Sequence, residues 1–178
     1  MKKFNPDDFT NAPRQLQKSR LINASKHKIW PIVADHKGMA SWMPMIKHVD
    51  LVKQGVHKDW GDGCERHCQF GPDLLEEKIV FWDEPNGYAY QISDMHLVKN
   101  HLGYISLESK GDGTQITWTQ YFKPNGNFVK QIISKHIMMP FIMSRALANL
   151  ERKVLSNFNK REPFSKIASL LVLIFFSI

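Results

Sequence analysis

The sequence predicts an α+β fold in which a curved, seven-stranded antiparallel sheet wraps around one long C-terminal helix. Six strand-length runs follow one another between residues 46 and 122, separated by short turns that contain glycine or proline. After residue 126 the apolar residues recur at three- and four-residue spacing, which is the period of a helix. Because short turns join antiparallel neighbours, the runs are expected to form one sheet.

The elements before the main run of strands are short. Residues 17–23 have the composition of a strand, and Ser25 is placed to cap a helix over residues 26–34. A second helical segment is expected over residues 37–42, and Pro44 ends it.

The six strands of the main run have clear turn residues between them. Segments such as Gly61-Asp62-Gly63 and Gly111-Asp112-Gly113 supply the glycines that tight reversals need. The expected strands cover residues 46–53, 64–70, 74–82, 88–95, 101–109 and 114–122.

The last element is a helix predicted over residues 128–158, about 45 Å long if it is straight. Pro140 lies inside it and should bend it, because the proline ring displaces the carbonyl of His136 and removes one amide donor.

The order of elements and several local stretches are similar to one known superfamily. Those stretches are Arg20-Leu-Ile-Asn-Ala-Ser25, Ile29-Trp-Pro-Ile-Val-Ala-Asp35, Trp42-Met-Pro44, Glu77-Lys-Ile-Val-Phe-Trp-Asp-Glu-Pro85, Tyr88-Ala-Tyr90 and Thr114-Gln-Ile-Thr-Trp118. Over about residues 17–158 the chain resembles the START/Bet v1-like superfamily, also called SRPBCC or the polyketide cyclase/dehydrase and lipid-transport family. The resemblance implies a helix-grip fold that holds lipids, polyketides, quinones or hormones, with a minority of members acting as enzymes.

The expected domain organisation is simple, because 178 residues with 43% apolar content suit one packed domain. Residues 1–15 are expected to be an N-terminal extension, residues 16–159 the START/Bet v1-like ligand-binding domain, and residues 160–178 a basic and then apolar tail. No particular oligomeric state is favoured.

The net charge of +7 favours approach to anionic surfaces, but the basic residues are scattered. The sequence has no recognition-helix or RNA-binding motif, so we expect no specific nucleic-acid partner.

A cytoplasmic location is expected from the N-terminus and the cysteines. After Lys2 and Lys3 the chain continues with Pro6-Asp7-Asp8 and no apolar segment, which is not a secretory signal. Cys64 and Cys68 would lie about 13 Å apart in one strand, too far for a disulfide, and free thiols suit a reducing compartment.

The apolar tail over residues 167–178 leaves room for membrane association. Twelve residues rise only about 18 Å as a helix, less than the ~30 Å of a bilayer core. Three hypotheses stay open: an interfacial anchor assisted by the preceding basic residues, a segment that docks on the domain or on a partner chain, and an end without function.

Strand parity predicts which side chains face the helix and line a ligand cavity. The methionines among them are unbranched and adapt to ligands of varied shape. The predicted cavity residues are Trp42, Met43, Ile79, Phe81, Tyr88, Tyr90, Ile92, Ile105, Leu107, Ile116, Trp118, Gln120, Met139 and Met143.

Glu77 is the one weak catalytic candidate. We expect Glu77, Ile79 and Phe81 to share the inner face of their strand. Either Glu77 is a desolvated carboxylate with a raised pKa that anchors or protonates a ligand, or it pairs with Arg66 or His67 at the sheet rim.

Other chemistry is not supported by the residue pattern. Cys64 and Cys68 project from one face of a strand and His67 from the other, so no metal site and no cofactor are expected. His96 and His101 flank a turn, where solvent-exposed histidines are the simplest account, and no nucleophile elbow or phosphate loop occurs.

Three functions follow from these patterns. The first is a non-catalytic carrier or sensor of a lipid-like, quinone-like or polyketide-like molecule. The second is a cyclase-like enzyme that uses the same cavity, with Glu77 or a histidine as acid or base. The third is an interaction module like the ribosome-associated or respiratory-chain members of the superfamily, with salt-sensitive binding.

Overall fold

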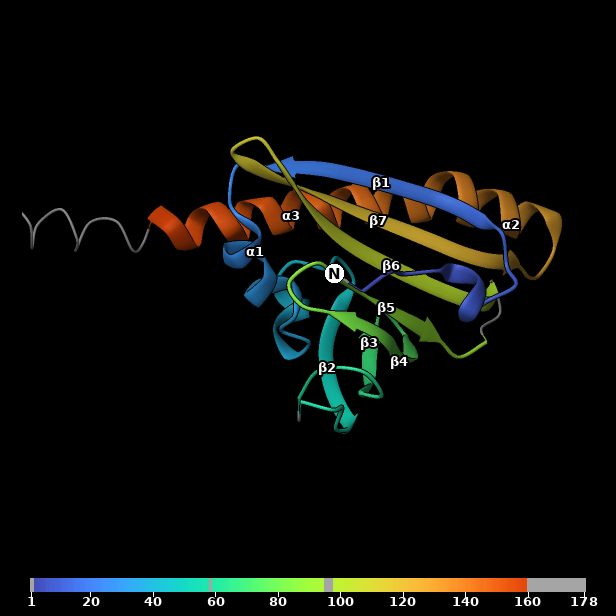
Figure 1. Cartoon of the computed structure of the whole chain (residues 1–178). Helices are drawn as coiled ribbons and strands as arrows, with labels where there is room; N and C mark the ends of the chain where they lie inside the picture. Colours follow the sequence, from blue (N-terminus) through green and yellow to red (C-terminus); the bar gives the residue numbers. More distant parts are fainter. Residues whose placement is uncertain (1, 58, 95–97, 160–178) are drawn as a thin grey trace, which may run out of the picture.

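A seven-stranded antiparallel sheet that curves around a long C-terminal helix forms most of the computed structural model (Figure 1). The structure describes residues 2–57, 59–94 and 98–159. The predicted α+β helix-grip architecture is confirmed, because strands and helices occur in the expected order.

The strands are β1 Arg14–Ile22, β2 Ile46–Lys53, β3 Glu65–Phe70, β4 Asp73–Asp83, β5 Gly87–Ile92, β6 Val98–Lys110 and β7 Gly113–Pro124. The helices are α1 Lys26–Val33, α2 Phe128–Ile133 and α3 Met139–Asn159, with 3₁₀ turns η1 Pro6–Asp8 and η2 Lys37–Ser41 and a π-helical segment η3 Ser134–Met138.

The sheet has the strand order β1-β7-β6-β5-β4-β3-β2, so the first strand pairs with the last. Short turns join neighbouring strands and place them antiparallel. One of them, between β6 and β7, contains Gly111, which has a φ of 58°. The chain therefore has to pass from one edge of the sheet to the other between β1 and β2. The short helices α1 and η2 make that connection.

Helix α3 packs its apolar side against the inner face of the sheet, behind β1 and β7 in Figure 1. Met143, Leu147 and Leu150 belong to the same buried cluster as the strand residues. At the edge of the sheet, Arg20 Nε of β1 donates to Glu151 Oε2 of α3 at 2.7 Å. This ion pair ties the helix to the first strand.

A π-helical segment lies next to Pro140, where the sequence predicts a bend; the bend itself stays a prediction. Residues 128–159 are helical throughout, and η3 lies directly before α3, which has Pro140 as its second residue. A proline has no amide hydrogen for the carbonyl four residues earlier, and a wider turn gives its ring room.

Strand β4 contains a β-bulge that reverses the predicted orientation of its last residues. The register against β5 shifts between Ile79 and Phe81, so Ile79 and Trp82 are both buried in the core. Our prediction that Phe81 faces inward beside Ile79 is wrong. A bulge adds one residue to a strand and exchanges the two faces beyond it.

The N-terminal segment covers this outer side of the sheet. The ring of Phe4 stacks on Tyr104 of β6 with centroids 3.8 Å apart, and Phe9 meets the edge of Phe81 at 6.4 Å. Figure 1 shows the blue N-terminal segment crossing the front of the sheet before the chain enters β1. Strand β1 begins at Arg14, earlier than residue 17 where the sequence placed its start.

Candidate functional site

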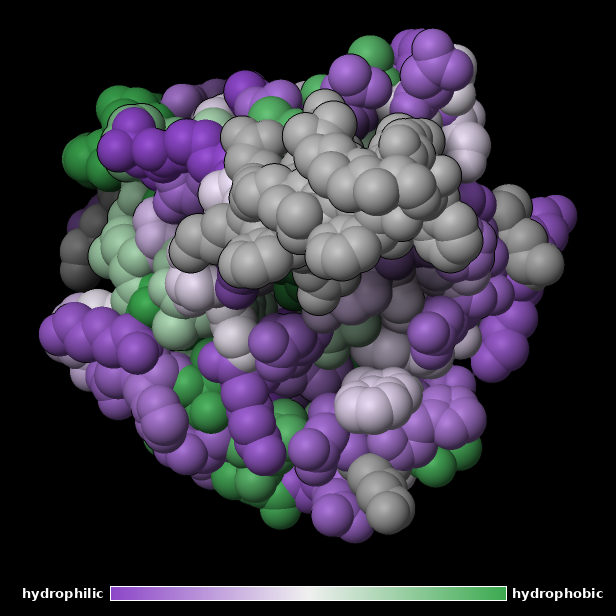
Figure 2. Space-filling view, turned by 90° about the vertical axis from the view of Figure 1, so that its left-hand side faces the viewer, coloured by the Kyte–Doolittle hydropathy of each residue, from purple (hydrophilic) through white to green (hydrophobic). Residues whose placement is uncertain are grey.

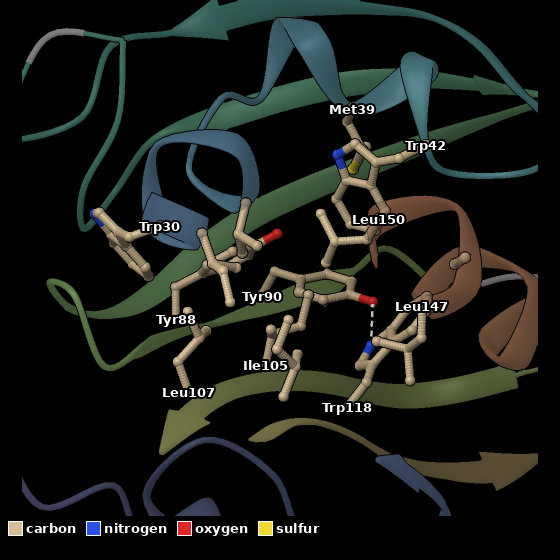
Figure 3. Close-up of a cluster of buried hydrophobic side chains, with 14 of the residues drawn as sticks. Trp30, Met39, Trp42, Tyr88, Tyr90, Ile105, Leu107, Trp118, Leu147 and Leu150 are labelled. Carbon is tan, nitrogen blue, oxygen red and sulfur yellow. Dashed lines mark hydrogen bonds between the residues drawn. The ribbon is translucent and has the colours of Figure 1, made fainter. Parts of the chain in front are cut away.

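The inner face of the sheet and α3 enclose a cluster of large apolar side chains (Figure 3). Most residues predicted to line a cavity meet there: Trp42, Ile79, Tyr88, Tyr90, Ile105, Leu107, Ile116, Trp118, Gln120 and Met143 are all buried. Met43 and Ile92 are partly buried against the cluster, Met139 is half-buried, and Phe81 lies on the outer face. Their role as ligand contacts stays a prediction.

A buried ion pair interrupts this apolar interior. Arg66 of β3 and Glu77 of β4 are register partners, and both are almost fully buried, at 1% and 6% exposure. Arg66 Nε donates to Glu77 Oε2 at 2.7 Å, and Arg66 Nη2 lies 2.6 Å from the same oxygen. Of the two alternatives for Glu77, pairing with Arg66 is found, but in the core instead of at the sheet rim.

His36, from the segment that joins α1 to η2, extends this polar group. Its Nδ1 lies 2.5 Å from Arg66 Nη1. A guanidinium only donates hydrogen bonds, so His36 Nδ1 is the acceptor and the ring proton sits on Nε2. Burial and the adjacent positive charge of Arg66 lower the pKa of His36 to about 2, which keeps the ring neutral.

A second polar group, centred on Tyr90 of β5, is formed by residues of β5, β6 and β7. The Tyr90 hydroxyl accepts hydrogen bonds from Trp118 Nε1 at 3.2 Å, drawn in Figure 3, and from Gln120 Nε2 at 3.1 Å. The tyrosine keeps its own hydroxyl proton to donate. The Tyr90 ring also lies 5.7 Å from the Arg66 guanidinium, which brings the two polar groups together.

His101 completes the second group. Its Nε2 lies 2.5 Å from Gln120 Oε1, and because that oxygen accepts, Nε2 carries the proton and Nδ1 is left as an acceptor. Burial lowers the pKa of His101 to about 4, although its hydrogen bond to Gln120 acts in the opposite direction. The sequence-based expectation of a solvent-exposed His101 is wrong, since it is 3% exposed, and His96 lies outside the described residues.

Gly103 has no side chain, and the Tyr90 ring lies in the space that a side chain at this position would fill. Gly103 of β6 is the register partner of Tyr90, and a Cβ added there would lie 2.3 Å from the tyrosine Cζ. Only a residue without a side chain lets the ring lie across β6 at this point.

Among the buried residues of the described chain, several polar atoms have no hydrogen-bond partner. They are His36 Nε2, Trp42 Nε1, Trp82 Nε1, His101 Nδ1 and Asp62 Oδ1. Native proteins satisfy most of their buried polar atoms, so each of these atoms calls for a partner outside the described residues, either an ordered water or a bound molecule.

An open pocket of about 530 Å³ lies beside the buried polar groups. The pairing of β5 with β6 ends at Tyr90 and Gly103, whereas the pairing of β4 with β5 continues to Glu77 and Ile92. The pocket lies at this divergence, and its lining includes Glu77, His101 and Ile92 together with outward-facing residues. Residues from both faces of the sheet therefore line the same space.

Sequence reasoning missed His36 and Arg66 as buried polar residues. Arg66 could have been found, because it has the same strand parity as the two buried cysteines, Cys64 and Cys68. His36 lies in a connection between helices and gives no periodic signal.

The described residues contain no group of three His, Cys, Asp or Glu side chains that could hold a metal ion. Cys64 and Cys68 are free and buried. In the same part of the chain, every helix is too short or too polar to span a bilayer.

Comparisons with known proteins agree with this architecture. A family model described as polyketide cyclase/dehydrase and lipid transport matches residues 13–155. No curated protein matches the chain.

Solved structures with the same fold cover most of the chain. XoxI from Bacillus cereus is 22% identical with a TM-score of 0.62, over 79% of this chain and 94% of that one. Ara h 8.0201 is 18% identical with a TM-score of 0.63, over 79% and 97%. A START superfamily protein from Mycobacterium smegmatis is 15% identical with a TM-score of 0.62, over 81% and 99%. At such identities the likeness concerns the fold.

Proposed function

Because the chain belongs to the polyketide cyclase/dehydrase and lipid-transport family, whose model matches residues 13–155, we propose that it is a non-catalytic carrier or sensor of a hydrophobic small molecule. The molecule is of the lipid, quinone or polyketide kind and binds between the sheet and α3. Burial of its apolar body supplies the affinity, at about 25 cal/mol per Å².

The observation that carries the proposal is the pair of partnerless polar atoms at the apolar interior. His101 Nδ1 accepts and Trp42 Nε1 donates, and neither has a partner among the described residues. A ligand that carries a hydroxyl could donate to His101, and one that carries a carbonyl could accept from Trp42. These atoms favour an apolar molecule with a few oxygen groups over a pure hydrocarbon.

The pocket at the divergence of β5 and β6 supports a route to this interior. Its volume of about 530 Å³ lies within the ~300–1,000 Å³ that is usual for ligand sites, and its lining reaches His101, Arg66 and Glu77. We expect a ligand to enter there with its polar end near these residues.

Native mass spectrometry of the purified protein, followed by organic extraction, tests the proposal. We expect a bound molecule near one per chain, and loss of it in His101→Leu, which removes the acceptor. His48→Leu is the matched control, because His48 of β2 is solvent-exposed. Circular dichroism checks that both variants fold.

A second assay covers protein that purifies without ligand. The protein is titrated with oleic acid, decylubiquinone and naringenin, which represent lipids, quinones and polyketides. If the protein is empty and binds none of the three, the carrier proposal is wrong.

We also infer that the carrier exchanges its ligand at an anionic lipid surface through α2, η3 and the start of α3. The apolar side chains exposed on this helical face are Phe128, Val129, Ile132, Ile133, Ile137 and Phe141. No Asp or Glu occurs between Asp112 and Glu151, whereas Lys123, Lys135 and Arg145 do. Apolar residues on a basic helical segment suit the interface of an anionic bilayer.

Vesicle sedimentation tests this surface. Full-length protein should bind phosphatidylcholine vesicles that contain phosphatidylglycerol more strongly than pure phosphatidylcholine vesicles. The double variant Phe128→Ser/Phe141→Ser should lose this binding, and Leu74→Ser, which alters an exposed leucine on β4, should keep it. Unchanged binding by the double variant would contradict the inference and would favour the contact through the tail, residues 160–178, which lies outside the described residues.

The enzyme alternative has less support from the site. Glu77 Oε2 is held by two nitrogens of Arg66, which carries a permanent charge, so the carboxylate already has a partner. His101 has a pKa near 4 and is neutral at pH 7. A cyclase would show turnover that Glu77→Gln abolishes while binding persists.

The buried free thiols fit the cytoplasmic location that we expect.

A further inference from the structure

Three tryptophans gather around a pocket that is separate from the entrance described above. Trp30 comes from α1, Trp82 from β4 and Trp60 from the connection between β2 and β3, and Leu51 of β2 adds an apolar wall. The pocket has a volume of about 360 Å³, and none of its lining residues lines the entrance pocket. We call it the tryptophan pocket.

Two buried N–H donors at this pocket have no partner among the described residues. His36 is 3% exposed and Trp82 is 5% exposed, and both line the pocket. Because His36 Nδ1 accepts from Arg66, its Nε2 carries a proton and points away from Arg66. Trp82 Nε1 is a donor in every state. Neither nitrogen has a hydrogen-bond acceptor.

The rings around these donors hold them in place. Trp82 meets the edge of Trp30 at a centroid distance of 4.9 Å and the edge of the His36 ring at 5.7 Å. The donors therefore lie in a packed aromatic wall, which suits a planar apolar ring with an acceptor oxygen.

The charged residues of the lining select against anions. Asp35, Asp59 and Glu84 supply three carboxylates, and Lys37 supplies one ammonium group, 3.6 Å from Asp59. A carboxylate or phosphate ligand would be repelled by the excess negative charge. A neutral carbonyl or ether oxygen accepts hydrogen bonds without that repulsion.

The surroundings favour a small molecule over a protein partner. Figure 2 views the end of the molecule where α1 lies in Figure 1, and outside the grey atoms it shows mainly hydrophilic residues with apolar ones in small separate groups. The pocket volume of about 360 Å³ is within the range of small-molecule sites.

From these observations we propose that the tryptophan pocket is a second binding site, for a neutral aromatic molecule that carries a carbonyl oxygen. The oxygen accepts from Trp82 Nε1 and His36 Nε2, and the ring packs against the indoles. This site does not depend on what the interior between the sheet and α3 binds.

The test uses 1-tetralone as probe, with tetralin as the matched molecule that lacks the oxygen and 1-naphthoate as the anionic one. The sequence has five tryptophans, so their indole N–H signals form a small set in a ¹⁵N–¹H spectrum. The Trp82 signal, assigned by its loss in Trp82→Phe, should move with 1-tetralone and stay unchanged with tetralin. Binding of 1-naphthoate should be the weakest.

Trp82→Phe keeps a ring but removes the donor, and it should weaken 1-tetralone binding about tenfold, the value of one good hydrogen bond. Trp42→Phe is the control, because it removes the partnerless indole of the interior. Equal loss in Trp42→Phe would place the probe in the interior and overturn the proposal. An unmoved Trp82 signal at saturating probe would also overturn it.

If Trp82→Phe does not fold, the Trp82 indole signal is assigned in the wild-type protein by triple-resonance spectroscopy, and the wild-type protein alone tests the site. Nuclear Overhauser contacts between 1-tetralone and the Trp82 indole proton support the site, and contacts only to Trp42 or Trp118 contradict it.

Discussion

Arg66 and Glu77 face each other across β3 and β4, and two nitrogens of the guanidinium share one carboxylate oxygen in the core. The Arg66 guanidinium also lies 5.8 Å from the centroid of the Tyr88 ring. A buried pair of this kind is costly to break, because the remaining charge has no water to stabilise it.

Glu77→Gln should lower the free energy of unfolding by about 3–5 kcal/mol, measured by urea denaturation, because it leaves the Arg66 charge without a counter-ion in the core. Glu65→Gln is the matched control, because Glu65 of β3 pairs with Lys53 in an exposed bridge, at 3.1 Å, and its loss should cost less than ~1 kcal/mol. If the two variants lose similar stability, the Arg66–Glu77 pair is not desolvated as described. The double variant Arg66→Met/Glu77→Leu should lose less free energy of unfolding than Glu77→Gln, because it leaves no unpaired charge in the core.

The free energy of unfolding should decrease as the pH is lowered below 6.5, because two histidines are buried. The pKa values of His36 and His101 are lowered to about 2 and about 4, so the unfolded chain binds protons that the folded chain does not. Their contribution is present above pH 6.5 and is lost as pH falls toward these values, at ~1.4 kcal/mol per pH unit for each histidine.

The contribution of His101 can be isolated with His101→Gln. Between pH 6.5 and pH 5 the wild type should lose about 2 kcal/mol more than this variant in urea titrations, because glutamine does not titrate. His36 contributes equally to both proteins and cancels. Parallel pH profiles would show that His101 can be protonated in the folded state.

The thiols of Cys64 and Cys68 should be unreactive in the native protein. Both side chains are fully buried, and burial raises the pKa of Cys68 to about 12 and raises that of Cys64. Iodoacetamide at pH 8 should modify neither residue in native protein and both in urea, as read by mass spectrometry. Rapid labelling of the native protein would mean that β3 opens locally.

Gly103→Ala should destabilise the fold by about 1–3 kcal/mol, because the new Cβ would overlap the Tyr90 ring. In a Tyr90→Ala background the same substitution should cost much less, since the overlapping ring is gone. A double-mutant cycle in urea measures this coupling. Additive effects would show that Tyr90 does not lie over Gly103.

Much of the fold follows from the sequence, and the reasons are local. Turn glycines separate the strands, and strict alternation placed Tyr88 and Tyr90 on β5 and Trp118 on β7 in the interior. The alternation failed at Phe81, because the bulge in β4 leaves no mark in the pattern of apolar residues.

The polar part of the site depends on contacts between distant segments. His36 meets Arg66 across 30 positions of the chain, and His101 meets Gln120 across 19. Periodicity sorts residues onto faces but does not say which residues of two elements meet, so these pairs could not be predicted.

The N-terminal segment has a consequence for how the molecules behave toward one another in solution. It is fastened to the outer side of the sheet by Gln91 Nε2, which donates to the Phe9 carbonyl at 2.7 Å, and by Thr10 Oγ1, which donates to the Asn100 carbonyl at 2.8 Å. Beneath it lie the aromatic rings of Phe81 and Tyr104. A chain that began at residue 14 would expose these rings, and two such molecules could join through them. The first residues thus cover an aromatic surface that would otherwise be open to contact between copies of the chain.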